Sequence, residues 1–428
     1  MAHPLDIVIV GAGLAGLTAA IQCAISGHSV TVLEGAKKLA EIGAGLQLTP
    51  NATRLLQTWR VYELIEDQVC EPVSLTVHSY KGQVLAHEAQ FDKSMRSKYG
   101  APFADCHRVD LQRALVRRAE ELGVRVELNA KVSFIDSGSS EGDLAKIVTE
   151  DNQAYVADLV VGADGLWSTC RSAMLGRRDP PLPTGDLAYR IVLGIDQIED
   201  AKLRDMMQRP ACRFWAGPDA HAVAFSLRSG TMYNVVLVVP DDLEEGITRT
   251  EGNIDEMRKR FEGWDPVLTQ LLSYVSSVDK WKLMHRSPLE SWINPHSNLV
   301  LIGDSCHPML PYLAQGANSS MEDGAVLGLV LGPQYLKDRS QLPRILRLFE
   351  QLRKARGENI ARETFKQRRV FHMRNGPEQQ QRDSLMLSML NSGQIYEQPQ
   401  SLGRLTRSYM ANLGNWRGTN RASLHIVH

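Results

Sequence analysis

Residues 6–16, DIVIVGAGLAG, decide the fold of this chain. The β-branched first half predicts a buried parallel strand, and Leu14 to Ile25 predicts the helix that follows the glycine turn. Gly11 permits the tight turn, Gly13 lets the backbone approach a pyrophosphate, and Gly16 lets helix and strand pack closely. The sequence therefore predicts the strand, turn and helix that open a dinucleotide-binding α/β fold.

A second expected strand, Ser29 to Leu33, ends at Glu34. An acidic side chain at this distance from the glycine turn accepts hydrogen bonds from a ribose hydroxyl. Because its carboxylate would repel a 2′-phosphate, the site suits FAD or NAD better than NADP. Ile7 to Ser26 has no charged residue, and hydropathy alone would also allow a membrane span. The turn-spaced glycines and Asp6 at the entrance favour the nucleotide-binding turn.

Composition narrows the class of protein. The chain has 428 residues, 43% of them apolar, which is enough for two or three domains and more than one core. Its 48 Lys and Arg balance 49 Asp and Glu, so bulk charge indicates neither nucleic acid nor an anionic membrane surface as a partner. The six cysteines lack the spacing of a zinc site or a disulfide framework. We expect free thiols, no metal and a cytoplasmic location.

A second motif, Gly303-Asp304, and the segments on either side of it indicate a flavin. Asn298 to Ile302 reads as a strand that delivers Gly303 and Asp304 to its carboxyl end, where ligands of α/β folds collect. Asp304 can accept a hydrogen bond from a ribityl hydroxyl. Gln315 to Asn318 then opens an expected helix to about Leu331, and its positive N-terminal end would face the flavin pyrimidine.

Nucleotide-binding features recur along the chain with other material between them, so one domain is expected to be discontinuous. Between 185 and 290 short runs alternate apolar and polar residues, notably His221 to Leu227 and Tyr233 to Val239, which predicts an antiparallel sheet. Residues 340–375 read as a charged helix packed along the outside. The polar stretches Ser137 to Asp143 and Glu378 to Arg382 read as loops. The expected division is 1–70, 100–180 and 294–335 for the nucleotide, 71–99 and 181–293 for a substrate, and 336–428 as a C-terminal helical segment.

Five stretches in order resemble the group A flavoprotein aromatic hydroxylases, the single-component FAD monooxygenases that include salicylate hydroxylase and p-hydroxybenzoate hydroxylase. They are GAGLAG, EIGAGLQLTPNATRLL, HRVDLQRAL, GADGLWSTCR and GDSCHPMLPYLAQGANSSMEDG. The resemblance covers roughly residues 5–370. It implies an α/β Rossmann-like FAD-binding domain with an inserted antiparallel-sheet substrate domain and C-terminal helices. It also implies tightly bound FAD. NADH or NADPH would bind only transiently as the electron donor, because no second dinucleotide fingerprint follows.

The resemblance assigns further cofactor residues. Gln47 belongs to the turn of Gly43 and Gly45 that approaches the flavin in the family, although the stretch also suits an ordinary helix entry. Arg108 matches an FAD-binding arginine ahead of a helix from Leu111, and otherwise reads as a solvated charge. Asp164 matches a motif that serves FAD and the nicotinamide donor, and otherwise reads as a plain Asp-Gly turn. The predicted cofactor residues are Gly11, Gly13, Gly16, Glu34, Gln47, Arg108, Asp164, Asp304, Gly316 and Ala317. One departure is Ala314, where the family commonly has glycine.

Two residues are predicted to be catalytic on the substrate side. Arg190 begins the expected substrate sheet and aligns with an arginine that resembling enzymes use near the substrate, where it could pair with a carboxylate or phenolate; the alternative is a structural salt bridge. His221, in the family's W-x-G-P-x-x-H pattern, could relay a phenolic proton; the alternative is a packing role. Four residues on, Phe225-Ser226 replaces a frequent Tyr-Pro pair, so no phenol hydroxyl is available there.

The chemistry implied is hydroxylation of a phenolic ring by reduced FAD and molecular oxygen. It needs a dry pocket in which a C4a-hydroperoxyflavin survives. Salicylate-type hydroxylation is the leading expectation, with loss of CO₂ left open. The alternatives are the same chemistry on a polyketide-like or indole intermediate of a biosynthetic pathway and, more distantly, a non-enzymatic FAD-fold protein. A homodimer is also considered.

Overall fold

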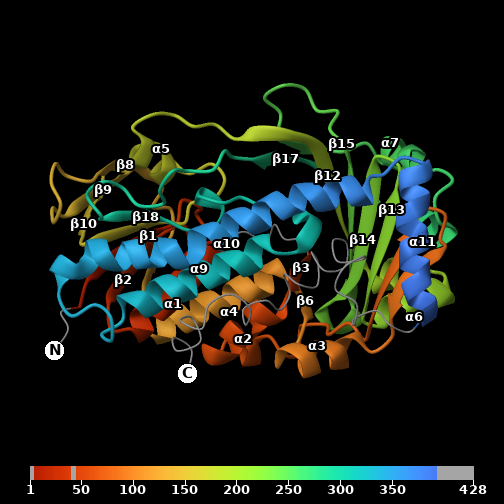
Figure 1. Ribbon diagram of the computed structural model, residues 1–428, viewed down its shortest axis with the longest axis horizontal. Coiled ribbons are helices and arrows are strands. Elements are labelled where there is room, and N and C mark those ends of the chain that lie inside the picture. Colours follow the sequence, from red (N-terminus) through yellow and green to blue (C-terminus); the bar gives the residue numbers. More distant parts are fainter. Residues whose placement is uncertain (1–3, 40–44, 393–428) are drawn as a thin grey trace.

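The computed structural model describes residues 4–39 and 45–392. Figure 1 shows two regions side by side, a small sheet with its covering helices on the left and a larger sheet on the right. The long helix α10 (Leu342–Phe371) runs across from the first region to the second. The expected Gly43 lies outside the described residues.

The smaller region is built on a parallel sheet of five strands in the order β18-β11-β1-β2-β7. Numbered along the chain this is the 3-2-1-4-5 arrangement of a doubly wound fold, read from β7 to β18. The strands are mostly short, apolar and buried, as expected for a sheet covered on both faces. They are β1 (Asp6–Val10), β2 (Ser29–Leu33), β7 (Arg125–Glu127), β11 (Leu159–Gly162) and β18 (Leu299–Leu301).

Helix α1 (Leu14–Ile25) follows the glycine turn with the bounds that the sequence predicts. It packs against α9 (Gly316–Leu331) and α4 (Arg108–Glu121). The crossing with α9 is close because α9 has glycine at the contact: a Cβ on Gly324 would lie 2.5 Å from the backbone nitrogen of Ala19. Helix α4 begins three residues before the expected Leu111, because Arg108 follows strand β6 directly.

The larger sheet has eight strands in the order β16-β17-β12-β15-β14-β13-β4-β5. The antiparallel sheet expected between 185 and 290 is present, and β4 joins it through a parallel pairing with β13 that the sequence did not indicate. The strands are β4 (Ser74–Ser79), β5 (Val84–Glu88), β12 (Leu182–Gly194), β13 (Ala211–Gly217), β14 (Ala220–Leu227), β15 (Met232–Pro240), β16 (Arg249–Glu251) and β17 (Asp279–His285).

Alternation along these strands gives the large sheet two different faces. On β13 Trp215 packs into the core beneath α6 (Ala201–Gln208), α7 (Ile254–Arg260) and α8 (Pro266–Ser273). Its neighbour Phe214 points the other way, into a second core that includes residues of the loop before α9 and Phe371 of α10. The second face therefore looks toward the nucleotide-binding region.

Shorter elements complete the chain. A two-stranded ladder joins β3 (Gly45–Leu48) to β6 (Ala104–His107), and a three-stranded ladder lies beside the parallel sheet. The strands of the three-stranded ladder are β8 (Val132–Asp136), β9 (Ala145–Thr149) and β10 (Ala154–Ala157). The remaining helices of at least seven residues in this part of the chain are α2 (Pro50–Thr58), α3 (Phe91–Tyr99) and α5 (Thr169–Leu175). The loop expected at Ser137 to Asp143 joins β8 to β9.

One expectation about the C-terminal segment is wrong and one is confirmed. Glu378 to Arg382 is not a loop but lies within α11 (Pro377–Ser392), because Pro377 opens a helix and Glu378 favours its first turn. Helix α10 is the charged helix expected over 340–375, and its inner face buries Arg353, which is 1% exposed, and Phe371, which is 6% exposed. No helix in the described residues combines the length and apolar character that a bilayer crossing requires.

Candidate active site

The carboxyl ends of four parallel strands bring four predicted cofactor residues to one edge of the sheet. Gly11 follows β1, Glu34 follows β2, Asp164 follows β11 and Asp304 follows β18. The order of strands reverses between β1 and β11, which is where doubly wound sheets open a crevice for a ligand. The turn between β1 and α1 lies at this reversal of strand order.

The three glycines of the first turn have different physical roles. Gly11 adopts φ +105°, and a Cβ there would lie 2.6 Å from the carbonyl oxygen of Ala163. A Cβ on Gly16 would lie 2.0 Å from the carbonyl oxygen of Gly11. A Cβ on Gly13 would meet no atom within 4 Å. Gly11 and Gly16 therefore allow close packing, while Gly13 leaves the space beside the N-terminus of α1 free for a pyrophosphate.

Glu34 is fixed at the same turn. Its carboxylate accepts hydrogen bonds from the backbone N–H of Ala12 at 2.8 Å and of Ala36 at 2.9 Å. Each carboxylate oxygen has a further lone pair. The side chain is therefore oriented by the backbone and still able to accept a hydrogen bond from a ribose hydroxyl.

Asp164 is engaged within its own loop. One oxygen accepts a hydrogen bond from the Ser168 hydroxyl at 2.6 Å and the other from the backbone N–H of Cys170 at 2.9 Å. The nearby Arg171 is 1% exposed and pairs with Asp179 at 2.7 Å. Asp164 thus organises the entry to α5, while Arg171 ties that helix to Asp179 beyond its C-terminal end. Asp164 therefore has a structural function in addition to any role toward a cofactor.

The loop from β18 to α9 completes the edge. Gly303 adopts φ +62°, and the side chain of Asp304 is exposed, as is that of Arg108 at the start of α4. Gly316 and Ala317 form the first turn of α9 and line a cavity. Ala314 adopts φ 51° and ψ 29°, the left-handed conformation that glycine takes most easily, which explains why glycine is common in the family at this position.

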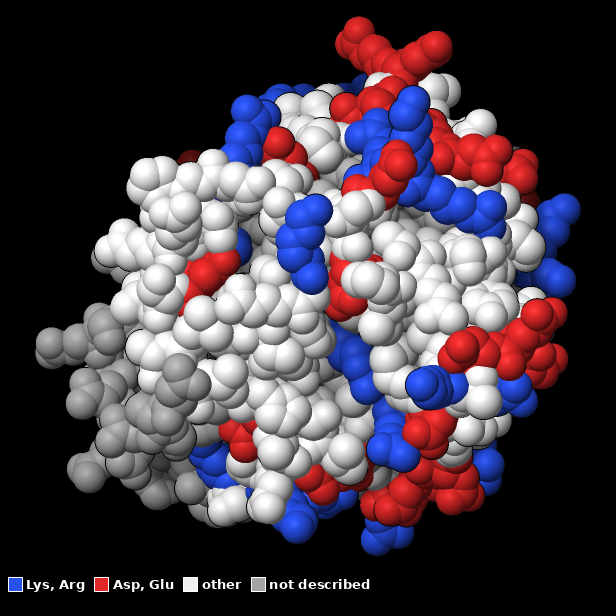
Figure 2. Space-filling view, turned by 90° about the vertical axis from the view of Figure 1, so that its right-hand side faces the viewer, with Lys and Arg blue, Asp and Glu red and all other residues white. Residues whose placement is uncertain are grey.

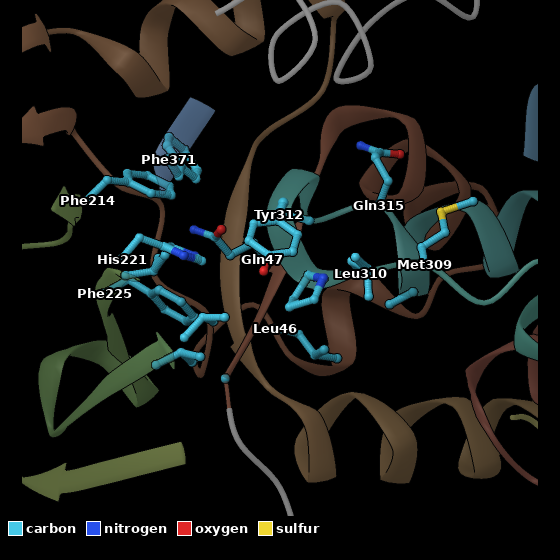
Figure 3. A pocket seen from close by; sticks show the side chains of 18 residues that line it. Leu46, Gln47, Phe214, His221, Phe225, Met309, Leu310, Tyr312, Gln315 and Phe371 are labelled. Atoms are coloured by element: carbon cyan, nitrogen blue, oxygen red, sulfur yellow. The ribbon is translucent and has the colours of Figure 1, made fainter. Parts of the chain in front are cut away.

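A cavity of about 200 Å³ lies where the loop before α9, strand β3 and the second face of the large sheet meet. Figure 3 shows Phe214, His221, Phe225 and Phe371 gathered on one side and Met309, Leu310 and Gln315 on the other, with Gln47 and Tyr312 between them. Most of its wall is aromatic or aliphatic. The full lining is Gly45, Leu46, Gln47, Phe214, His221, Val223, Phe225, Val236, Val238, Met309, Leu310, Pro311, Tyr312, Ala314, Gln315, Gly316, Ala317 and Phe371.

His221 lies in the wall of this cavity. It is 2% exposed and its ring packs against Tyr312 and Phe371, with centroids 5.1 and 5.2 Å away. Its Nδ1 lies 2.8 Å from Nε2 of His372, the residue that follows α10. Burial, and then the neighbouring His372, hold the pKa of His221 well below its usual range. The lowered pKa favours the uncharged form of the imidazole.

Tyr312 contributes its ring to the cavity and its hydroxyl to a buried ion pair. The hydroxyl donates to Asp186 at 2.5 Å, and Arg368 of α10 donates to the same carboxylate. Burial, followed by the charge of Asp186, raises the pKa of Tyr312. The phenol therefore keeps its proton.

Gln47 is held by two buried groups beneath the cavity. Its side-chain nitrogen donates to Asp105 at 3.2 Å and to the sulfur of Cys212 at 3.1 Å. Asp105 is fully buried, and desolvation raises the pKa of its carboxyl to about 8. The sequence gave no signal for Asp105, because it becomes notable only when β6 carries it beside Gln47 and Cys212.

Arg190 lies away from the cavity lining. It sits in the interior of β12 rather than at the start of the sheet, which corrects the expectation. Its guanidinium lies over Trp281 at 4.7 Å, with Arg249 also over that ring at 4.4 Å. Burial, and next the charge of Arg108, lower the pKa of Arg190 to about 10. No carboxylate pairs with Arg190 or Arg108 within the described ranges, so the alternative interpretation of Arg190 as one half of a structural salt bridge has no support there.

A buried ionic cluster lies behind the loop. Donor atoms of Cys306, His307 and Asp323 lie within 4.8 Å of one another, as in a metal site. However, Asp323 is 2.5 Å from Nε2 of His307 and 2.7 Å from Nε of Arg353. A guanidinium already supplies the positive charge there, so the cluster is an ion-paired support for α9 and α10. All six cysteines of the chain are buried and free, as the sequence predicts.

Comparison with known proteins agrees with this arrangement. Residues 4–364 match the family described as FAD binding domain. The chain is 48% identical over 389 residues to FAD-dependent monooxygenase OpS4 of Beauveria bassiana, covering 90% of this chain and 89% of that protein. It is 30% identical to 3-hydroxybenzoate 6-hydroxylase of Polaromonas naphthalenivorans, covering 86% and 88%.

Solved structures agree in fold. A salicylate hydroxylase substrate complex has a TM-score of 0.74 at 21% identity, covering 95% of this chain and 98% of that one. CtdE in complex with FAD and its substrate has a TM-score of 0.77 at 20% identity, covering 91% and 99%. The predicted architecture, a Rossmann-like nucleotide-binding sheet joined to a large and mostly antiparallel sheet, is confirmed.

Proposed function

Because this chain belongs to the FAD-dependent aromatic monooxygenases, we propose that it hydroxylates a one-ring phenol of the hydroxybenzoate class in the cavity beside His221. The observation that carries the proposal is the cavity itself. Its volume is about 200 Å³, and Gln47, Gly316 and Ala317, which are proposed to contact the cofactor, line it together with His221, so the space for the substrate is small. Aromatic and aliphatic side chains wall it, and His221, Gln47 and Gln315 add polar groups. Relatives named as 3-hydroxybenzoate 6-hydroxylases support the class of substrate.

The cofactor is FAD, and the family typically takes electrons from NADH or NADPH. When bound and reduced, FAD supplies the means to transfer one atom of O₂ to an aromatic carbon. We propose that the first turn and Glu34 hold the nucleotide, that Asp304 and Arg108 hold the middle of the cofactor, and that Gly316 and Ala317 face its ring. Gln47 and Asp164 complete the proposed set. The open space at Gly13 supports this placement.

His221 is proposed to act as the base toward the substrate. An uncharged, buried imidazole in the wall has an unprotonated ring nitrogen that can take the phenolic hydrogen, and a phenolate is a better acceptor of oxygen. The apolar wall keeps water away from the reacting atoms. Phe225 lines the wall where many relatives have tyrosine, so the ring is oriented here by His221, Gln47 and packing.

Arg190 is proposed to act by charge rather than by contact with the ring. It lies near Arg108, and neither guanidinium has a carboxylate partner in the described part of the chain. Two such cations favour an anion between them, which suits a phosphate or an anionic substrate approaching the cavity.

We further propose that the enzyme is a cytosolic homodimer that uses molecular oxygen, with the domain division expected from the sequence. Six free thiols suit a reducing compartment. Figure 2 shows basic and acidic side chains intermixed on the face beside the large sheet, around a broad area with neither, which is a candidate surface for the second copy. Light scattering coupled to size exclusion tests the dimer; a monomer at micromolar concentration would contradict it.

The test of the function is oxidation of NADH and NADPH by the purified yellow protein, together with oxygen uptake and product analysis. Salicylate, 3-hydroxybenzoate and 4-hydroxybenzoate form the first panel, and a bicyclic polyketide-type phenol and an indole form the second. We expect stimulation and a hydroxylated product with a member of the first panel. Turnover with only the second panel would contradict the one-ring proposal and favour a biosynthetic substrate.

The role of His221 is tested with the His221→Gln variant, and His285→Gln is the matched control. Both remove an imidazole, but His285 lies on β17 outside the cavity lining, in contact with Phe365. We expect His221→Gln to lower kcat by roughly a hundredfold and His285→Gln to leave it unchanged. Equal activity of both variants would show that His221 is not the base.

A further inference from the structure

His372 lies behind the active-site wall, at a position that none of the sequence motifs covers. It follows α10, and its Nε2 is 2.8 Å from Nδ1 of His221 on β14. The two rings are 5.0 Å apart between centroids. His221 is almost fully buried, whereas His372 is partly exposed. The pair therefore leads from the cavity toward the surface.

The hydrogen bond fixes how the two imidazoles can share protons. Nδ1 of His221 is used by His372, so Nε2 is the nitrogen left for a phenol in the cavity. Burial lowers the pKa of His372 to about 4, and His221 is lowered as well, so both rings are neutral near pH 7. In a neutral pair one nitrogen donates and the other accepts. The pair can therefore receive a proton at one end and release one at the other.

We propose that His372 is a positioning residue that carries the phenolic proton away from His221 to solvent. The inference rests on the proposed role of His221 as the base. In the transfer, the phenol O–H bond breaks and N–H forms at Nε2 of His221. The Nδ1–H of His221 moves to Nε2 of His372, and the Nδ1–H of His372 passes to water. No oxidant or reductant is required, and each ring ends neutral in its other tautomer.

The charged groups around the pair leave this route open. Asp186 of β12 is neutralised by Arg368 of α10, and Asp219, in the turn between β13 and β14, pairs with Arg374 at 2.8 Å. The backbone N–H of Asp219 donates to the carbonyl oxygen of His372 at 3.2 Å, which fixes the main chain there. Burial lowers the pKa of His372 most, Arg368 lowers it further, and Asp186 and Asp219 raise it by less.

The alternative exit is through Tyr312, which also touches His221. Its hydroxyl already donates to Asp186, and that carboxylate is held by Arg368. A proton moved along this path would have to displace the guanidinium contact and ionise a tyrosine whose pKa is raised. The route through His372 needs no ionised intermediate group, so it is the favoured one.

The test compares His372→Gln with His372→Phe, and uses His285→Gln as the matched control. Glutamine can keep a hydrogen bond to Nδ1 of His221 but cannot pass a proton from one ring nitrogen to another. Phenylalanine keeps the ring volume and removes both functions. Flavin content and the visible spectrum of each holoenzyme show that the site is assembled before any rate is compared.

The first measurement is proton release when a phenol binds to the holoenzyme without NADH or NADPH, followed in weak buffer with a pH indicator. It needs binding but no hydroxylation, so its result is independent of turnover. We expect release to slow by roughly tenfold or more in His372→Gln and His372→Phe, and not in His285→Gln. Added imidazole should restore the rate in a His372→Ala variant. Unchanged release in His372→Gln would overturn the relay.

The second measurement is the pH profile of kcat. We expect His372→Gln to lower kcat by roughly ten- to hundredfold near pH 7, with KM little changed, and to make the rate rise with pH as the free phenol ionises. A loss in His221→Gln with wild-type behaviour in His372→Gln would overturn the relay and keep the proposed base. Wild-type behaviour in both variants would overturn the base and the relay together.

Discussion

At the scale of single residues, Ala314 holds a backbone conformation that favours glycine. Its φ of 51° is left-handed, which costs a non-glycine residue about 1 kcal/mol. We therefore expect Ala314→Gly to raise the free energy of unfolding by about 0.5–1 kcal/mol, measured by urea denaturation. Ala325→Gly, within α9, is the control and should lower it by about 1 kcal/mol or more. Destabilisation by Ala314→Gly would contradict the strain.

Asp105 gives a second prediction at this scale. Burial raises the pKa of its carboxyl to about 8, so the folded state binds this proton more tightly than the unfolded state does. The stability that this proton contributes is complete below the ordinary pKa of aspartate and is lost as pH rises toward 8. Asp105→Asn removes that dependence because an amide does not titrate.

The measurement for Asp105 is urea unfolding of both proteins between pH 5 and 8. We expect the stability of Asp105→Asn relative to the wild type to increase with pH, by up to about 1.4 kcal/mol per unit. Asp110→Asn is a contrasting control. Asp110 forms an ion pair with Arg228 at 2.8 Å, so removing its charge should lower the free energy of unfolding. A constant difference for Asp105→Asn across the range would show that the carboxyl is ionised in the folded protein.

At the scale of elements, the contact between α1 and α9 depends on glycine. A Cβ on Gly324 would lie 2.5 Å from the backbone nitrogen of Ala19, and that atom cannot move without bending α1. We expect Gly324→Ala to lower the free energy of unfolding by about 1–3 kcal/mol, by overpacking. Gly316→Ala, in the same helix, is the control, because its Cβ would meet only Met309 at 3.9 Å. Equal stability of the two variants would contradict the close crossing.

Elements whose signal is local could be predicted from the sequence. Helix α1, strand β2 and helix α9 have their expected places, because a glycine turn, a β-branched run and a helix N-terminus each act over a few residues. Strand β3 was not expected, since its partner β6 is far away in the chain. The polar composition of 378–382 suggested a loop, whereas Pro377 starts a helix there.

The same distinction applies to the site. His221 could be found because it lies in a motif, and the structure places it in the cavity wall. His372 and Asp105 could not, because each becomes notable only through a partner that folding brings to it. The role of Arg190 near the substrate stays a prediction; in the structure its guanidinium lies over Trp281, a contact that the sequence did not indicate. Side-chain direction within a strand depends on register, which a single sequence specifies weakly.

At the scale of the whole molecule, the proposed cofactor residues and the large sheet meet around one cavity, so FAD should stabilise both regions. A ligand that binds only the folded state at 100 times its Kd adds about 2.7 kcal/mol. We expect the FAD-free protein to unfold at a lower temperature in calorimetry and to recover on addition of FAD. NAD is the control and should have little effect. No stabilisation by FAD would contradict the proposed placement.

The order of the strands in the parallel sheet also affects how the protein folds during its synthesis. Strand β1 lies between β2, made soon after it, and β11, made much later, and the outer strand β18 is made later still. The ribosome therefore releases β1 and β2 long before β11, which pairs with the other edge of β1, has been made. Such non-local pairing slows folding and leaves a strand edge exposed to other chains. The sheet can be completed only after Leu301 of β18 has been made.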